Sequence, residues 1–392
     1  MERHLHEILP AFLRNCQVGG KERNRAMNSD KILGGYVKIG TLCGAASLFR
    51  GLLLLSVVAG PAWSAAKSPT TPAELALYRG ADRQQILEAG AKKEGKLILY
   101  TTGILNQTVT PKVNAFQKKY PYLKVEIWRA ETVSLVSKYL QEYGAGRYAV
   151  DVIEVTQSGE VILEEKKALL PFFSPNLSSI DSDAIKKSPG GEALAVGTYE
   201  SGRVLGYNTK LVKKEQLPRS YKDLADPKWR GKVALAGSSS GVNWMGTILN
   251  FNGEELVQKI AKQNFDLHEV SARAVLDMVI NGEYALSPTC TDSHVIESKK
   301  KGAPVDWIPL EPVQVNSGQI MLPPNPPNPH AALLYVDFNL SREVGELYLG
   351  TGYDSPRKDI PDQKTYKKYY GPDTTEQFAK WLEIFNKYFI KK

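Results

Sequence analysis

Short apolar runs alternate with amphipathic segments along most of this chain, and this alternation restricts the folds open to it. Three such runs lie at residues 96–100, 124–128 and 151–155, and the segments between them carry apolar residues at helical spacing. Strands separated by helices in this way form crossover units, in which neighbouring strands run parallel and helices cover the sheet. The pattern therefore predicts an α/β protein built on mostly parallel sheets.

The remaining elements follow the same rules over a chain of 392 residues, a length that suggests two compact units. With 42% hydrophobic and 23% charged residues, the composition is that of an ordinary globular protein and excludes collagen and coiled coil. We expect a leading helix over 73–94, a helix capped by Thr110, and a helix that begins near Asn243. Further strands are expected at 202–207, 232–236, 284–286 and 307–310, and further helices at 331–340 and 375–389.

The N-terminal region has the parts of a secretory signal. Basic residues up to Arg50 precede the apolar run 51–60, which Pro61 and a stretch of small residues follow. The run is shorter than the roughly 20 residues that a membrane helix needs. Residues 1–65 are thus predicted to be an N-terminal extension and cleaved signal peptide of a periplasmic protein. A membrane anchor is the alternative, because residues 39–49 are also apolar.

Charge and cysteine content limit the partners of the mature chain. Loss of residues 1–65 removes eight basic and four acidic residues, so the formal net charge falls from +8 to +4. This mild excess suits an anionic ligand, and no basic stretch interleaved with aromatic residues indicates nucleic acid binding. Cys290 is the one cysteine beyond residue 65, so an intrachain disulfide is not expected.

A series of motifs resembles those of a known family. The order in which the motifs occur is more specific than any one of them, and together they extend over about residues 73–358. They are residues 94–102 (EGKLILYTT), 115–121 (AFQKKYP), 145–147 (AGR) before Asp151-Val152, 223–233 (DLADPKWRGKV) and 329–332 (PHAA). This series is similar to that of the extracellular solute-binding proteins of ABC importers, in particular the ferric-iron-binding-like branch.

The resemblance implies a two-lobed periplasmic-binding-protein type 2 fold, with a ligand cleft between lobes that close on the solute. It implies lobe 1 at residues 66–197 and 316–360, and lobe 2, with the C-terminal helix, at 198–315 and 361–392. The implied partners are a small polar or anionic solute and an ABC permease in the inner membrane. We expect a monomer without enzymatic activity, cofactor or nucleic acid partner. A sensing role instead of transport remains open.

Candidate ligand residues lie where the predicted strands end. Parallel sheets present ligands at the carboxyl ends of their strands, where free N–H groups at helix starts attract anions. Plain helix capping is the alternative for the hydroxyl groups, and an internal salt bridge is the alternative for the one arginine. The candidates are Thr101, Thr102, Glu131, Thr132, Thr156, Gln157, Tyr199, Arg203, Ser238, Ser239, Ser240, Thr291 and Asp292.

The chain departs from its ferric-binding relatives at the metal ligands. Those relatives use an adjacent pair of tyrosines, and the corresponding positions here are placed at Thr291-Asp292. The adjacent pair Tyr369-Tyr370 lies beyond the matched region. Cys290, Asp292 and His294 alternate along what we predict to be an extended strand, but their spacing gives little support for a metal site. We therefore expect no metal; binding of ferric iron or an iron chelate is the alternative.

An alternative from another class is a serine hydrolase. Residues 237–241 match the G-x-S-x-G nucleophile elbow, with Ser239 as the nucleophile. Asp292 or Asp306 and then His330 follow in the required order. The absence of an HGGG-type oxyanion loop and the helix start at His330 weigh against this alternative.

Overall fold

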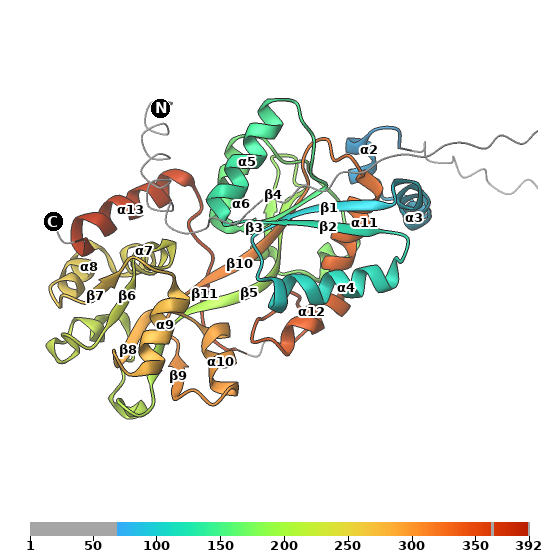
Figure 1. The fold of residues 1–392 in the computed structure, drawn as a ribbon. Coiled ribbons are helices and arrows are strands. Elements are labelled where there is room, and N and C mark those ends of the chain that lie inside the picture. Colours follow the sequence, from blue (N-terminus) through green and yellow to red (C-terminus); the bar gives the residue numbers. More distant parts are fainter. Residues whose placement is uncertain (1–68, 362–363, 391–392) are drawn as a thin grey trace, which may run out of the picture. The chain divides into compact units, whose positions relative to one another are not determined.

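Two long strands, β5 (Ala193–Asn208) and β10 (Val313–Met321), organise the fold. A computed structural model of the chain describes residues 69–361 and 364–390, and Figure 1 shows its elements. The sheet has the strand order β2-β1-β3-β10-β5-β4, with β8 and β9 also paired to β5 and β11 to β10. The other strands of this sheet are β1 (Lys96–Thr101), β2 (Lys124–Arg129), β3 (Val152–Thr156), β4 (Ile185–Lys187), β8 (Leu286–Thr291), β9 (Val305–Ile308) and β11 (Lys368–Tyr369).

The expected parallel pairing holds in only part of the sheet. Strand β1 pairs parallel with β2 and with β3, as the crossover pattern predicts. Strand β10, in contrast, pairs antiparallel with both β3 and β5, and β5 pairs antiparallel with β4, β8 and β9. Strand β5 follows β4 directly and forms a hairpin with it, while β10 comes from a much later part of the chain, so neither is joined to its neighbour by a crossover helix.

Helices cover the first part of this sheet. The expected leading helix over 73–94 is in fact two helices, α2 and α3, separated by a turn at residues 78–82 in which Tyr78 donates a hydrogen bond to Asp82. A π-helix, η1 (Leu105–Val109), leads into α4, so Thr110 begins that helix instead of capping it. The helices are α2 (Pro72–Leu77), α3 (Arg83–Glu94), α4 (Thr110–Lys119), α5 (Thr132–Gly144), α6 (Gln157–Glu165), α11 (Pro329–Asn339) and α12 (Arg342–Leu349).

A second group of elements surrounds the short parallel pair β6 (Ala234–Ala236) and β7 (Asp266–His268). Helix α7 begins at Ser239, earlier than the expected start near Asn243. The strand expected at 284–286 starts later and runs to Thr291. The helices of this group are α7 (Ser239–Asn252), α8 (Glu254–Ala261), α9 (Ala272–Asn281), α10 (Asp292–Lys300) and α13 (Thr375–Phe389), the last with the bounds predicted from sequence.

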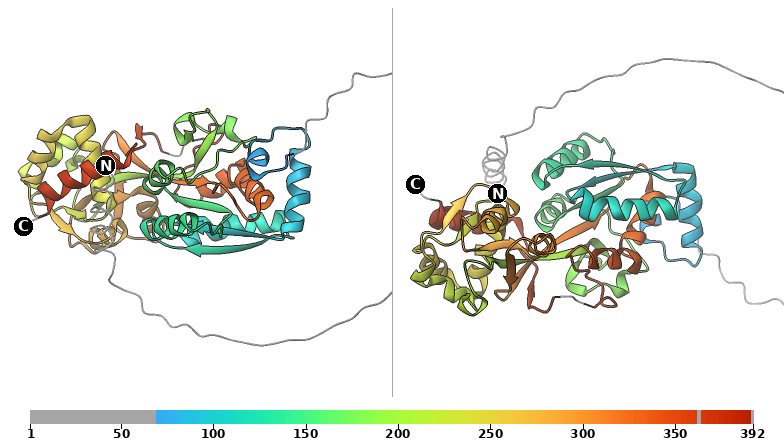
Figure 2. Two further views of the ribbon diagram at one scale, coloured as in Figure 1. Left: turned by 90° about the horizontal axis from the view of Figure 1, so that it is seen from above. Right: turned by 60° about the horizontal axis from the view of Figure 1, so that its bottom comes forward.

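Separate hydrophobic cores lie at the two ends of β5. Val196 packs with the core that includes α3, α4 and α11, whereas Leu205 and Tyr207 pack with α7, α8 and α13. Helix α13 adds Trp381 and Phe385 to this second core, and both views of Figure 2 place α13 beside the α7–α8 region. Such a division suits the expected two lobes, whose boundaries at 197–198 and 315–316 remain a prediction.

The described chain contains no helix that is both long and apolar enough to cross a membrane. The predicted signal peptide, and the apolar run that raised the question of an anchor, lie outside the described residues.

Candidate functional site

The starts of α5 and α6 come together at the ends of the parallel strands. Thr132 opens α5 and its hydroxyl lies 3.1 Å from that of Thr156, the last residue of β3. The Thr156 hydroxyl lies 3.0 Å from that of Ser158 in the first turn of α6. Two helix N-termini with a chain of hydroxyl groups between them therefore occupy the position that the sequence predicted for ligand contacts.

Thr101, at the end of β1, is engaged inside the protein. Its buried hydroxyl donates a 3.1 Å hydrogen bond to a Glu154 carboxylate oxygen and accepts a 3.0 Å hydrogen bond from the Gly103 backbone N–H. Glu154 also forms a 2.5 Å ion pair with the buried Lys112. Thr102 is partly buried and donates its backbone N–H to the Glu154 carbonyl at 2.9 Å. These contacts fix the loop that leads to η1.

Glu131 and Tyr199 lie in contrasting surroundings. Glu131 is exposed immediately before α5 and pairs with Arg129 at 3.2 Å. Tyr199, on β5, packs its ring against Tyr348 and Tyr353 with centroids 5.4 and 5.1 Å away. Burial raises the pKa of the Tyr199 phenol well above its ordinary value, so this side chain stays protonated.

Arg203 is a buried guanidinium without an acidic partner. Its side chain donates to the Thr291 hydroxyl at 3.0 Å and to the Thr289 carbonyl at 3.5 Å. Its Nε is buried with no hydrogen-bond partner, and within the described residues no carboxylate pairs with it. Burial lowers the pKa of Arg203 to about 10, which still leaves it charged at neutral pH. The alternative of an internal salt bridge is therefore not realised in this structure.

His294 lies near Arg203 and Arg273, and Asp292 acts electrostatically on both Arg203 and His294. His294, in the first turns of α10, is largely buried and its Nδ1 has no hydrogen-bond partner. Burial and the positive charges of Arg273 and Arg203 lower the pKa of His294 to about 4, so the imidazole is neutral at physiological pH. A buried cation beside a neutral imidazole favours a negatively charged group in its vicinity.

Asp292, in contrast, is fully occupied by protein groups. One carboxylate oxygen accepts hydrogen bonds from Ser201 at 2.7 Å and from the Ser293 N–H at 2.6 Å. The other accepts from Tyr366 at 2.8 Å and pairs with Lys364 at 3.0 Å. The side chain is completely buried, so its observed contacts serve to position α10.

The serine loop before α7 joins the Arg203 region through Thr289. Ser238 caps α7 by accepting from the Ser240 N–H at 3.4 Å, and Ser239 is the first helical residue. The Thr289 hydroxyl accepts from the backbone N–H of Ala236, two residues before Ser238. Thr289 thus links the end of β6 to the strand that contacts Arg203.

The predicted residues consequently fall into two groups. Thr101, Thr132, Thr156 and Gln157 lie at the ends of β1 and β3 and at the starts of α5 and α6, whereas contacts through Thr289 connect the other group. Arg203, Ser201 and Tyr199 alternate along β5 and share one face of that strand. This face extends from the first core to the second.

The hydrolase arrangement is not assembled. His330 contacts Glu94 at 2.6 Å through Nδ1, and Asp306 pairs with Lys299 at 2.8 Å. Asp292 is occupied as described above, so none of the expected partners contacts Ser239. The helix start predicted at His330 is observed, within the first turn of α11.

The possible metal ligands also lie differently from the extended strand assumed for them. Strand β8 ends at Thr291, so Cys290 lies on a strand while Asp292 and His294 lie on helix α10. Across residues 69–361 and 364–390, no group of three or more His, Cys, Asp or Glu side chains is placed to hold a metal ion. Tyr369 and Tyr370 are engaged with Asn250 and Glu200 respectively.

Sequence reasoning missed several residues that build this site. Ser201 had a usable signal, because it lies two residues before Arg203 on the same strand and so shares its face. Lys364 and Tyr366 had none, since they reach Asp292 from more than 70 residues away in the sequence. Glu154 gave no separate signal, because the sequence pattern identified it only as part of an apolar strand.

The α/β fold, with two hydrophobic cores joined by long strands, is shared with solved substrate-binding proteins. The chain belongs to the bacterial extracellular solute-binding protein family, which its residues 102–346 match. Members of this family bind solutes and are not enzymes. The match confirms the resemblance and the fold class inferred from the sequence.

Individual relatives are distant. The chain is 27% identical over 209 residues to iron uptake protein A1 of Synechocystis sp., an alignment that covers 48% of this chain and 57% of that relative. Trichodesmium IdiA (FutA), solved with iron and citrate, has a TM-score of 0.61 at 21% identity and covers 76% of this chain and 100% of its own. AfuA of Actinobacillus pleuropneumoniae, with fructose-6-phosphate bound, has a TM-score of 0.60 at 19% identity, covering 76% and 99%. These structures share the fold and hold different ligands.

Proposed function

We propose that this protein is the solute-binding component of an ABC importer and captures a small anionic solute in the periplasm. The observation that carries the proposal is Arg203, a buried guanidinium that forms no ion pair with a carboxylate of the described chain. An unpaired buried charge is costly, and an anionic ligand offsets that cost when it binds. Planar guanidinium groups bind carboxylates and phosphates through paired hydrogen bonds.

Hydroxyl groups and helix starts complete the proposed site. Thr291 orients Arg203, while Thr132, Thr156 and the α7 start at Ser238 offer hydroxyls and N–H groups. Closure of two lobes about β5 and β10 traps the solute, and the closed form then docks on a permease in the inner membrane. The predicted signal peptide supports export, and we propose that the protein acts as a monomer.

An iron(III)–carboxylate chelate is a second candidate solute. It is supported by the iron in the names of the Synechocystis and Trichodesmium relatives. Bare ferric ion is less favoured because the described residues contain no group of three or more His, Cys, Asp or Glu side chains placed to hold a metal ion. A chelate presents carboxylates of its own, and so it also suits Arg203.

The test is a calorimetric binding screen of small carboxylates and phosphate monoesters, each with and without ferric iron. Once a solute is found, Arg203→Met is expected to weaken binding about 10- to 150-fold, because a hydrogen-bonded charge contributes about 1.5–3 kcal/mol. Arg219→Met, at an exposed arginine, is the matched control. Binding restricted to cationic or uncharged compounds, or equal affinity in Arg203→Met, contradicts the proposal.

A further inference from the structure

A cavity of about 130 Å³ lies beside helix α6, away from the residues that contact Arg203. Since a water needs about 10–15 Å³ of such volume, there is room for several water-sized groups. One predicted ligand residue, Gln157, lines this cavity. The polar and charged residues that also line it are Glu160, Asp183, Lys186, Gln319, Tyr370 and Asp373, which come from α6, β4 and its approach, β10 and the segment before α13.

Two buried acceptors in the cavity wall lack a donor. Glu160 is 3% exposed, and its Oε1 has no hydrogen-bond partner. The Oε1 of Gln157, one helical turn earlier on α6, is likewise buried without a partner. Because buried acceptors are nearly always satisfied, a group that carries hydrogen-bond donors is expected between them.

The charge of the lining favours a cation. Glu160, Asp183 and Asp373 contribute three carboxylates, and Lys186 is the single basic residue of the lining. Lys186 is already paired with Glu164 at 2.9 Å, so it does not neutralise Glu160 fully. A metal ion fits poorly, because no set of His, Cys, Asp or Glu side chains in the described chain has suitable geometry.

We propose that this cavity binds a small primary ammonium ion, with Glu160 as its counter-ion and Gln157 as a second acceptor. An ammonium group carries three donors and one positive charge, which match two unsatisfied acceptors in an acidic surrounding. Gln319, 6% exposed on β10, also lines the cavity and offers a second amide oxygen as a third acceptor. The site is separate from Arg203 and does not depend on the solute proposed above.

The protonation of Glu160 gives the site a pH dependence. Burial raises the pKa of Glu160 to about 7, and Glu164 adds to this effect while Lys186 opposes it. Asp183, Asp373 and Tyr370 are the other titratable groups that face the cavity. Since the charged carboxylate binds a cation better than the neutral acid, affinity for the ammonium ion is expected to rise as the pH increases through 7.

The experiment titrates methylammonium chloride into the intact protein by calorimetry at pH 8. Tetramethylammonium, which has the charge but no N–H donor, is the ligand control. Glu160→Gln is expected to weaken methylammonium binding about tenfold or more, as the loss of a charged hydrogen bond implies. Glu283→Gln, at an exposed glutamate, is expected to bind as the wild type does.

Three outcomes would overturn the proposal: no saturable heat with wild type, equal binding of tetramethylammonium, or undiminished binding in Glu160→Gln. If Glu160→Gln does not fold, as circular dichroism would show, the wild type still provides the test. Its methylammonium affinity must then fall between pH 8 and pH 5.5, and an unchanged affinity refutes the assignment.

Discussion

Lys364 joins two buried carboxylates from different parts of the chain. Its ammonium group lies 3.0 Å from Asp292 at the start of α10 and 3.3 Å from Asp354 in the segment after α12. All three side chains are at most 3% exposed. Removing one member of such a cluster leaves charges in the protein interior without compensation, which is far more costly than losing an exposed ion pair.

Lys364→Met is therefore expected to reduce the free energy of unfolding by about 3–5 kcal/mol, measured by urea denaturation. The double variant with Asp292→Asn should regain part of this loss, because one of the unpaired charges is gone. Lys299→Met breaks an exposed pair with Asp306 and should cost no more than about 1 kcal/mol. Equal stability of Lys364→Met and Lys299→Met would show that the buried cluster contributes little.

At the residue scale, Glu160 is also expected to make the stability of the folded protein depend on pH. Its pKa is about 7 in the folded protein and 4.5 ordinarily, so the folded state holds the proton more tightly. The stability that this proton provides is present at low pH and is lost as the pH rises from about 4.5 through 7. The wild type should lose about 3 kcal/mol relative to Glu160→Gln over this window, since each pKa unit corresponds to about 1.4 kcal/mol.

Urea denaturation of both proteins at pH 4, 6 and 8 measures this difference. Comparing the two proteins cancels the titrations of groups that both contain. Asp354 is one such group, and burial raises its pKa to about 6. A stability difference that does not change with pH would show that Glu160 is not buried as an isolated carboxyl group.

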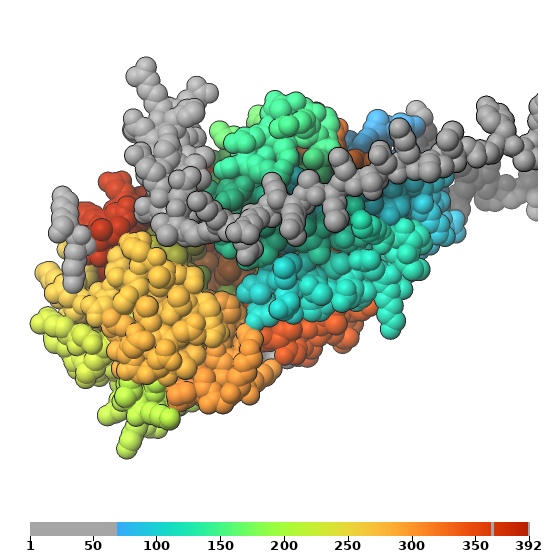
Figure 3. All heavy atoms as spheres, viewed as in Figure 1, coloured from blue at the N-terminus to red at the C-terminus, as the bar shows by residue number. Residues whose placement is uncertain are grey.

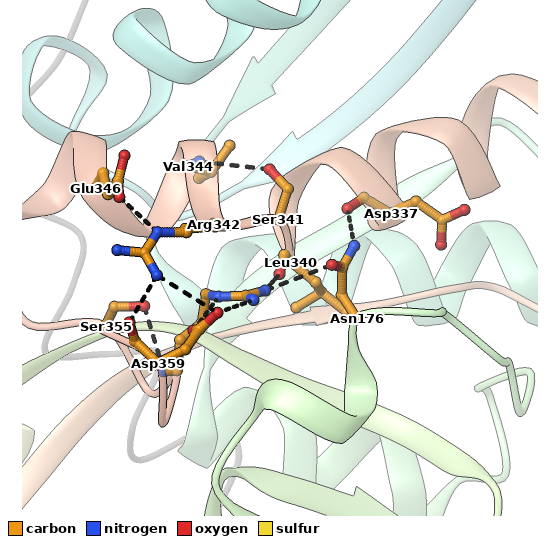
Figure 4. A network of polar contacts seen from close by, with 10 residues as sticks. Asn176, Asp337, Leu340, Ser341, Arg342, Val344, Glu346, Ser355 and Asp359 are labelled. Atoms are coloured by element: carbon orange, nitrogen blue, oxygen red, sulfur yellow. Dashed lines mark hydrogen bonds and ion pairs between the residues drawn. The ribbon is translucent and has the colours of Figure 1, made fainter. Parts of the chain in front are cut away.

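A network of polar contacts joins the end of α11 to the segment that follows α12. Arg357 donates to the Leu340 carbonyl at the end of α11 and binds Asp359 through two hydrogen bonds of 2.9 and 2.8 Å. Figure 4 shows Asn176, Leu340 and Asp359 converging at this junction, and Asn176 also donates to the Asp337 carbonyl at 2.8 Å. One guanidinium thus ties a helix end to a loop that follows α12.

Arg357→Lys should lower the unfolding free energy by about 1–3 kcal/mol, because a lysine ammonium lacks the planar fork that binds Asp359 and Leu340 together. Arg342→Lys is the matched control in the same network, since its side chain is 55% exposed and pairs with Glu346. It should change stability by about 0.5 kcal/mol or less. Thermal unfolding of the two variants measures both changes, and similar losses would contradict the role given to Arg357.

At the scale of the whole molecule, a polar contact connects η1 with α10, away from β5 and β10. Gln107 in η1 donates to Glu297 on α10, and Tyr353 donates to the Gln107 amide oxygen at 3.3 Å. Figure 3 shows the start of α4 against the α10 region on this face. If the lobes separate when solute leaves, as we propose, this contact is broken in the open form.

Gln107→Ala should therefore weaken solute binding about three- to tenfold, chiefly through faster dissociation, because a hydrogen bond that favours the closed form contributes about 0.5–1.5 kcal/mol. Stopped-flow measurement of solute release tests this. Asn106→Ala, at an exposed neighbour, is the control. Unchanged release in Gln107→Ala would indicate that this contact persists in both states.

Much of the architecture follows from local pattern. The strands β1, β2 and β3 and the helix α13 lie within a residue of their predicted bounds, because burial on both faces or on one helical stripe leaves a periodic signal. The ordered motifs identified the family, which the match to residues 102–346 confirms. The break between α2 and α3 was missed, although Gly80 lies in the turn that a Tyr78–Asp82 hydrogen bond stabilises.

For the candidate site, the sequence by itself determined which hydroxyl-bearing residues lie at strand ends and helix starts, and which arginine lies on the long strand. Only the tertiary structure decided that Asp292 pairs with Lys364 while Arg203 forms no ion pair with a carboxylate. The physical reason is that charge compensation depends on contacts between residues far apart in the chain. Hydrophobic periodicity records whether a side chain is buried, and it carries no information on which distant partner meets it there.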